Sequence, residues 1–233
     1  MHRLFYMMKR SRKLISANKG ETIMSNTVIT IARQYGSGGR TVGKMLAKRL
    51  DIPCYDREII SLASEESGIH PTLFQDEKKR HGSLRAFLTG GFKNASPLSP
   101  ESAGFTKDDN LFRYQAKIIR QLAEESSCVI IGRCADYLLR ERENVIRCYI
   151  FAPYQARIRN SIMTLGLANA EPQRIIEEVD KARAEYYRSH TGCEVNNTRY
   201  RDLFLNSNLL GVEGTADLIV DAVRRKFGLP EEK

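Results

Sequence analysis

A glycine-rich stretch near the N-terminus carries residue types that bind phosphate groups. The letters TIARQYGSGGRTVGK cover residues 30–44, and an apolar run precedes the cluster of Gly36, Ser37, Gly38 and Gly39. Glycines let backbone N–H groups approach phosphate oxygens, and the positive end of a following helix favours negative charge there. The stretch therefore predicts a phosphate-binding loop. A strand-to-helix turn without a ligand is the alternative.

The loop departs from the phosphate-binding motif G-x-x-x-x-G-K-[ST], because no lysine precedes the hydroxyl residue. In one register, Gly39, Arg40 and Thr41 occupy the last three positions, and Gln34 stands on the first glycine. A register shifted by one residue puts Arg33 on the first glycine, Gly39 on the lysine and Arg40 on the hydroxyl residue. We favour the first register, since Arg40 keeps a cation that can bind phosphate and Thr41 keeps a hydroxyl that can face Mg²⁺.

The elements that position this loop can be inferred from the hydrophobic pattern. A β-branched apolar run precedes the loop, and apolar residues then recur at helical spacing. Short apolar runs alternate with helical segments along the chain, which is typical of a parallel sheet covered on both faces. In such a sheet, ligands bind beyond the carboxyl ends of the strands, where the loop lies. Strands are expected at 27–32, 52–55, 128–132, 145–152 and 202–207, and helices at 40–50, 56–67, 111–126, 134–143, 153–165, 172–188 and 214–227.

Length and charge indicate one main domain preceded by a basic extension. The chain has 233 residues, enough for one sizeable core. Residues 1–25 are expected to be a disordered or artefactual extension, because the first 23 residues carry six Lys or Arg and one Glu, and Met24 could be the start. The rest holds 31 basic and 27 acidic residues, a net charge of +4, which disfavours a DNA-binding domain. A tail that contacts membranes or nucleic acid is the alternative.

Composition also bears on the cellular context. The five cysteines are odd in number and form no CxxC pair, and the four histidines show no metal-ligand spacing. This usage predicts reduced thiols in a cytoplasmic protein, with no structural zinc. The longest apolar runs fall far short of the roughly 20 residues of a transmembrane helix, so no membrane partner is expected.

Together these motifs resemble the cytidylate kinase-like branch of the P-loop nucleoside monophosphate kinases. The resemblance extends over about 27–227 and rests on the stretches ARQYGSGGRTVGK, YDREII, VIIGRCADYLL, DKARAEYYR and FLNS. It implies one P-loop kinase-like α/β domain over 26–233, a three-layer sandwich around a five-stranded parallel sheet. A substrate-binding insertion is expected at about 68–110, which is rich in Gly, Ser and Pro, and a helical lid at about 165–195. The implied activity is Mg²⁺-dependent phosphoryl transfer from ATP to a nucleoside monophosphate, with CMP as the expected acceptor.

The resemblance implies acceptor-binding residues after the second and third strands. Asp56 lies where the acceptor nucleotide would be held, although its position equally suits a helix N-cap. Arg133 matches the arginine of a Gly-Arg-Asp motif that contacts the acceptor phosphate, and a surface ion pair is the alternative. Cys134 replaces the aspartate of that motif, which leaves the choice of acceptor open. Asp136 could substitute for it only if the turn differs.

The expected lid helix carries further charged candidates. Asp180, Arg183 and Tyr187 share one face of the helix, and Arg188 lies near its end. The resemblance implies that Asp180 contacts substrate and that both arginines stabilise the phosphoryl group during its transfer. Phosphoryl transfer depends on such charge stabilisation more than on covalent chemistry. An ordinary solvated face is the alternative.

Two more segments supply weaker candidates. Arg157 and Arg159 lie beside the entry to the lid. The letters FLNS resemble the segment that flanks an adenine site, which implies nucleotide contacts by Asn206 and Ser207.

Three functions are compatible with these patterns. The first is a kinase in which the loop from Gly36 to Thr41 cradles the phosphates of ATP with Mg²⁺, while Arg133, Arg183 and Arg188 neutralise the acceptor and the transferring group. The second is a nucleotide-binding sensor or pseudokinase with little turnover, since the lysine is missing. The third is nucleic-acid binding by the basic tail, with an affinity that falls steeply with salt. These patterns specify no oligomeric state.

Overall fold

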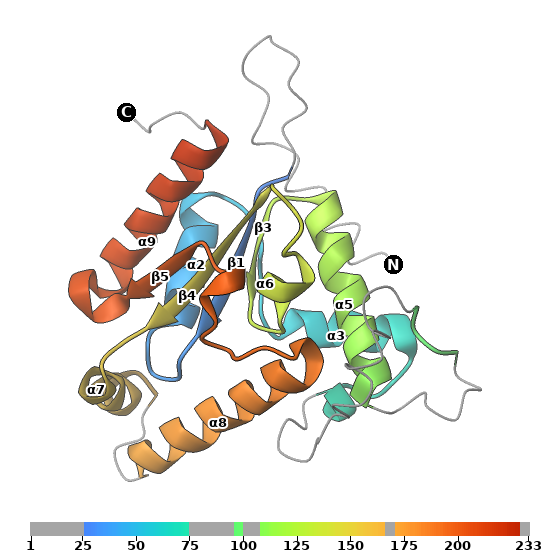
Figure 1. The fold of residues 1–233 in the computed structure, drawn as a ribbon, viewed down its shortest axis with the longest axis horizontal. Helices are drawn as coiled ribbons and strands as arrows, with labels where there is room; N and C mark the ends of the chain where they lie inside the picture. The colour runs from blue at the N-terminus through green and yellow to red at the C-terminus, as the bar shows by residue number, and fades with distance from the viewer. Residues whose placement is uncertain (1–25, 75–95, 100–107, 166–170, 229–233) are drawn as a thin grey trace.

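The structure, a computed structural model, describes residues 26–74, 96–99, 108–165 and 171–228. Its centre is a five-stranded sheet in the order β2-β3-β1-β4-β5, in which every neighbouring pair is parallel (Figure 1). This confirms the expected α/β fold. The strands are β1 (Val28–Arg33), β2 (Cys54–Tyr55), β3 (Cys128–Ile131), β4 (Val145–Phe151) and β5 (Leu203–Asn206).

Helices cover both faces of the sheet and complete the expected three-layer sandwich (Figure 1). The expected extension at 1–25 and most of the expected insertion at 68–110 lie outside the described residues. The helices are α2 (Gly39–Arg49), α3 (Glu58–Ser67), α5 (Asp108–Glu125), α6 (Ala135–Leu138), α7 (Tyr154–Leu165), α8 (Pro172–Thr191) and α9 (Ser207–Phe227), with short 3₁₀ turns at Pro71–Phe74 and Thr198–Tyr200.

The side chains of β1 alternate between two cores, as the pleat of a strand requires. Ile29 and Ile31 are completely buried and pack with residues of α2 and α9, while Val28 packs in the core that α3 and α5 cover. Complete burial of one such side chain contributes about 1.5–3 kcal/mol. Because β1 is central and buried on both faces, its carboxyl end is held firmly, and the glycine loop begins there.

One expected helix is much shorter than its pattern indicates. Residues 134–143 were expected to be helical, yet α6 ends at Leu138. The guanidinium of Arg147, which is buried on β4, donates to the carbonyl oxygens of Leu139, Arg140 and Arg142 at 2.7–2.9 Å. These carbonyls therefore bond a side chain instead of continuing the helix.

Helix boundaries also differ near the ends of α8 and α9. The helix α8 runs to Thr191, beyond the expected end at 188, and stops at Gly192, which has φ 70°. The helix α9 starts at Ser207, ahead of the expected 214, because the Asn206 side chain accepts a hydrogen bond from the N–H of Asn208. A kink at Gly211 interrupts α9, and it separates the unexpected first turn from the expected helix.

Candidate functional site

The glycine loop forms a left-handed turn directly before α2. Gly36 and Gly38 have φ of 73° and 74°, and Gly38 is the N-cap residue of α2. A Cβ atom at Gly36 would lie 2.6 Å from the carbonyl oxygen of Arg157, and one at Gly38 would lie 2.6 Å from a methyl group of Val212. Only glycine fits at both positions. The loop therefore delivers backbone amides and the positive end of a helix to the carboxyl edge of the sheet.

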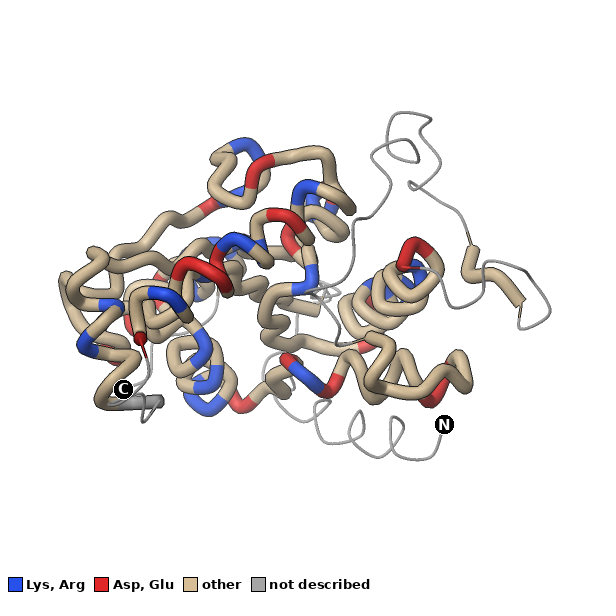
Figure 2. The backbone as a smooth tube through the Cα atoms, turned by 90° about the horizontal axis from the view of Figure 1, so that it is seen from below, with Lys and Arg blue, Asp and Glu red and all other residues tan. Residues whose placement is uncertain are grey.

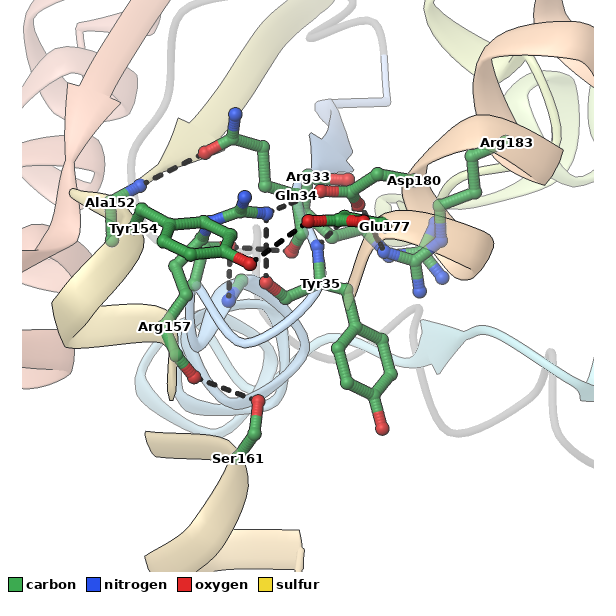
Figure 3. Close-up of polar contacts among 12 residues, drawn as sticks. Arg33, Gln34, Tyr35, Ala152, Tyr154, Arg157, Ser161, Glu177, Asp180 and Arg183 are labelled. Atoms are coloured by element: carbon green, nitrogen blue, oxygen red, sulfur yellow. Dashed lines mark hydrogen bonds and ion pairs between the residues drawn. The ribbon is translucent and has the colours of Figure 1, made fainter. Parts of the chain in front are cut away.

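Side chains from α7 and α8 hold this loop from one side (Figure 3). The N–H of Tyr35 donates to Asp180 Oδ1 at 2.7 Å, and its carbonyl accepts from Arg157 Nη1 at 3.2 Å. Arg157 also forms an ion pair with Asp180, and Asn160 Nδ2 donates to the carbonyl of Gly36 at 3.0 Å. Asp180 thus connects α8 to the loop through its contacts with Tyr35 and Arg157. Its expected contact with substrate stays a prediction.

Residues after β4 and β5 hold the loop from the other side. The buried Ser207 hydroxyl donates to the carbonyl of Ser37 at 2.6 Å and lies 3.1 Å from the carbonyl of Phe151. The amide of Ala152 donates to Gln34 Oε1 at 3.3 Å. In this structure Ser207 therefore anchors the loop, and Asn206 caps α9. Their expected nucleotide contacts remain untested.

The carboxylate of Asp56, which is expected to hold the acceptor, lies close to two arginines. Asp56 follows β2, and its carboxylate is 2.7 Å from Arg40 Nε and 3.9 Å from Arg33 Nη2. The N-cap residue of α3 is Arg57, so the interpretation of Asp56 as the helix cap is wrong. Arg40, the cation expected to replace the missing lysine, is therefore paired with the carboxylate that follows β2.

The turn after β3 has an unusual backbone. Gly132, Arg133 and Cys134 have consecutive φ values of 74°, 56° and 55°. A left-handed conformation costs a residue other than glycine about 1–2 kcal/mol. Strain of this kind collects at functional sites, where the surrounding structure holds it in place. The strain therefore points to a functional role for Arg133, which the sequence had already suggested as the contact to the acceptor phosphate.

A buried polar cluster fixes the helix that follows this turn. Asp136 pairs with Arg201 and accepts a hydrogen bond from the Tyr187 hydroxyl at 2.9 Å. Burial raises the pKa of Tyr187, which keeps this phenol protonated and able to donate. The Asp136 carboxylate is buried and committed to these partners, so it does not replace the aspartate missing from the Gly-Arg-Asp motif.

The two lid arginines lie in different surroundings. Arg183 donates to the carbonyl oxygen of Arg33 at 3.4 Å and lies over the ring of Tyr35, with 5.7 Å between its Cζ and the ring centroid. Arg188 forms two hydrogen bonds of 2.8 Å with Glu194, which lower the pKa of that carboxyl group. In this structure Arg183 thus borders the loop, and Arg188 is held by the connection after α8.

A cavity of about 460 Å³ opens between α8 and the ends of β1, β4 and β5. Tyr149, Phe151 and Phe204 give it an aromatic wall, and Arg33 and Arg183 add charge. Sequence reasoning made no prediction of this cavity. A signal was present, since Tyr149 and Phe151 lie in one expected strand and Phe204 in another.

The two weaker arginine candidates lie on α7 but differ in burial. Arg157 is buried and binds the loop, whereas Arg159 is exposed on α7. Basic and acidic residues are interspersed along the described chain, as Figure 2 shows. Across residues 26–74, 96–99, 108–165 and 171–228, no helix combines the length and apolar character needed to cross a bilayer.

Comparisons with known proteins agree with this architecture. An uncharacterized protein from Eubacterium ventriosum superposes with a TM-score of 0.62 at 22% identity, covering 85% of this chain and 98% of that one. A shikimate kinase from Acinetobacter baumannii gives a TM-score of 0.48 at 14% identity, covering 87% and 95%. A shikimate kinase from Bacteroides thetaiotaomicron gives 0.49 at 13% identity, covering 85% and 98%. No protein with a curated description matches the chain.

The family model agrees with the resemblance in the sequence motifs. The model of the cytidylate kinase-like family matches residues 28–209, which contain the glycine loop, the turn after β3 and α8. Such a family supports phosphoryl transfer of the kinase type. The chain belongs to the cytidylate kinase-like family.

Proposed function

We propose that this protein is an ATP- and Mg²⁺-dependent kinase whose acceptor is a nucleoside monophosphate, with CMP as the first candidate. The observation that carries the proposal is the loop before α2. Two of its glycines are required by left-handed backbone and close contacts, and it aims a helix N-terminus at the edge of the sheet. Such a loop suits a polyphosphate.

The donor side is formed by residues from Gly36 to Thr41. Backbone N–H groups would hold the phosphates, and Thr41, exposed in the first turn of α2, would offer its hydroxyl to Mg²⁺. Mg²⁺ in kinases keeps several waters and uses few protein ligands. Among the described residues, no group of three or more His, Cys, Asp or Glu could hold a metal ion, which fits a cation brought with the nucleotide.

The acceptor side is formed at the carboxyl ends of β2 and β3, which lie on one side of β1 in the sheet. The sheet order β2-β3-β1 places Asp56 and Arg133 next to the loop, after β2 and β3. We assign Asp56 to the acceptor nucleotide and Arg133 to its phosphate. A phosphate oxygen of the acceptor is already a nucleophile, so no general base is needed.

The helix α8 would close over both sides. Arg183 already lies against the loop, and Arg188 would join it by exchanging Glu194 for phosphate. Closure of this kind excludes water and brings positive charge to the transferring group. Asp180 would travel with α8, so its bond to Tyr35 links closure to the shape of the loop.

A nucleotide sensor or pseudokinase is the second candidate. Two observations favour it: the motif lysine is absent, and the N–H of Tyr35 is occupied by Asp180 instead of remaining available to a phosphate. Such a protein would bind nucleotides with little turnover.

An ATP-consumption screen over nucleoside monophosphates and other small acceptors tests the proposal. We expect ADP to form fastest with CMP. Turnover with a different small acceptor, and none with any nucleoside monophosphate, would contradict the proposed acceptor class. Thermal stabilisation by ATP without ADP formation for any acceptor would establish the sensor instead.

A further inference from the structure

Side chains at positions 33 and 39 would occupy the same space. A Cβ atom built on Gly39 would lie 2.7 Å from Arg33 Cβ and 3.3 Å from Arg33 Cγ. Non-bonded carbon atoms do not approach to 2.7 Å, because the optimum for such a pair is about 3.5–4.0 Å. Only one of these two positions can therefore carry a side chain in this loop.

Both positions depart from the motif in its shifted register, in which Arg40 also stands on the hydroxyl residue. There, Arg33 stands on the first glycine and Gly39 on the lysine. The structure fits this register, because Gly38 takes the left-handed conformation as N-cap and α2 begins at Gly39. In the motif, the first position is a glycine and the lysine comes six residues later. In this chain the order is reversed, because Arg33 ends β1 and Gly39 begins α2.

The Arg33 side chain occupies the space that a side chain at position 39 would need. A Cβ atom at Gly132 would overlap Arg33 Nη1, so the guanidinium lies directly against this glycine. Arg33 Nη2 lies 3.9 Å from Asp56, and the residue borders the cavity under α8. The guanidinium thus stands between the donor loop and the acceptor edge of the sheet.

We infer that Arg33 supplies the phosphate-binding cation that the motif lysine would otherwise provide. This inference rests on the proposed function and replaces the expectation that Arg40 has this role. Arg33 enters from β1 instead of from the helix, and its guanidinium can bind two phosphate oxygens at once. Its Cβ lies against Gly39 and its guanidinium lies against Gly132.

Charge removal at Arg33 is the first test. Arg33→Gln should lower turnover by roughly 10²–10³, as loss of one aligned donor does, and should weaken Mg·ATP binding in calorimetry. Arg40→Gln should have a smaller effect. Lys48→Gln is the matched control, since it removes an exposed cation from α2 away from the loop. Circular dichroism should show that all variants are folded. A loss in Arg33→Gln no larger than that in Lys48→Gln or Arg40→Gln would overturn the inference.

A double-mutant cycle is the second test, and it needs no activity. Gly39→Lys alone should lower Tm by roughly 3–10 °C, because the new Cβ overlaps Arg33. In the Arg33→Gly background, the same change should cost much less, since the two contacts with Arg33 are gone and the contact with Ile150 at 3.2 Å is less severe. Equal costs in both backgrounds would refute the shared space.

The double variant Arg33→Gly/Gly39→Lys restores the motif spacing G-x-x-x-x-G-K. It should bind Mg·ATP at least tenfold more tightly than Arg33→Gly alone. If the double variant does not regain Mg·ATP binding in this way, Arg33 does not take the role of the lysine. If the wild-type chain binds no Mg·ATP, the proposed function fails and the inference about phosphate binding fails with it, whereas the Tm cycle still decides whether the two positions share one space.

Discussion

Two turns at neighbouring strand ends build the site by different means. The loop after β1 uses glycines at φ 73° and 74°, for which a left-handed backbone costs little, and side chains from other elements hold it in place. The turn after β3 places Arg133 and Cys134 in the same left-handed region, where each is strained. The first turn presents backbone amides, and the second presents an arginine.

Because of this difference, we expect the two turns to control different properties, phosphate binding for the first and acceptor choice for the second. In the proposed function, the loop after β1 binds phosphate through backbone amides, and its shape depends on glycines and on contacts from other elements instead of on a lysine. The turn after β3 would act through the Arg133 side chain, and Cys134 stands where the motif has an aspartate that would help to select the acceptor. We therefore expect changes to the first turn to abolish binding and changes to the second to alter acceptor use.

The largest effect is expected at the loop. Gly36→Ala should lower the free energy of unfolding by about 3 kcal/mol and abolish turnover, because it adds left-handed strain and a Cβ 2.6 Å from the carbonyl of Arg157. Chemical denaturation and ATP consumption measure both effects. Gly68→Ala is the control, since Gly68 has φ 71° but nothing within 4 Å of an added Cβ. It should cost only about 1 kcal/mol. Equal costs would show that contacts do not shape the loop.

A smaller, acceptor-specific effect is expected at the second turn. Arg133→Gly should raise the acceptor KM at least tenfold and change the unfolding free energy by no more than about 1 kcal/mol, because relief of strain offsets the lost contacts. Asp51→Gly relieves φ 47° in an exposed turn and should leave KM unchanged. A loss of stability above about 3 kcal/mol with normal KM would make Arg133 a structural ion-pair residue.

The link between α8 and the loop should be weaker still. Asp180→Asn keeps an acceptor for the N–H of Tyr35 but removes the ion pair with Arg157, so stability should fall by about 1 kcal/mol. Hydrogen exchange should show faster opening of the Tyr35 amide. Glu177→Gln, which changes an exposed partner of Tyr154, is the control. Unchanged exchange in Asp180→Asn would mean that α8 does not hold the loop.

The smallest effect concerns pH at the acceptor edge. Burial, with help from the nearby Asp56 charge, raises the pKa of the Cys54 thiol from 9.0 to about 11. The unfolded chain therefore loses this proton first, and stability should fall as the pH rises from about 9 to about 11. Denaturation curves of Cys54→Ala should show a shallower fall over this window. Identical slopes would mean that the thiol titrates normally in the folded protein.

Sequence predicted the fold and the location of the loop, because strand runs and glycine clusters leave local patterns. It missed features that depend on distant side chains. Arg147 ends α6 early by bonding its carbonyl groups, and Asp180 binds Tyr35 across the site. The register of the loop also depended on packing, since only the structure shows that Arg33 and Gly39 exclude each other.

The central claim is that the loop after β1 holds the phosphates of a nucleotide. Titration calorimetry of the full chain with Mg·ATP tests it most directly. We expect one nucleotide to bind per chain, with binding retained in Gly68→Ala and lost in Gly36→Ala. Absence of heat for the wild-type chain, or equal binding by both variants, would contradict the claim.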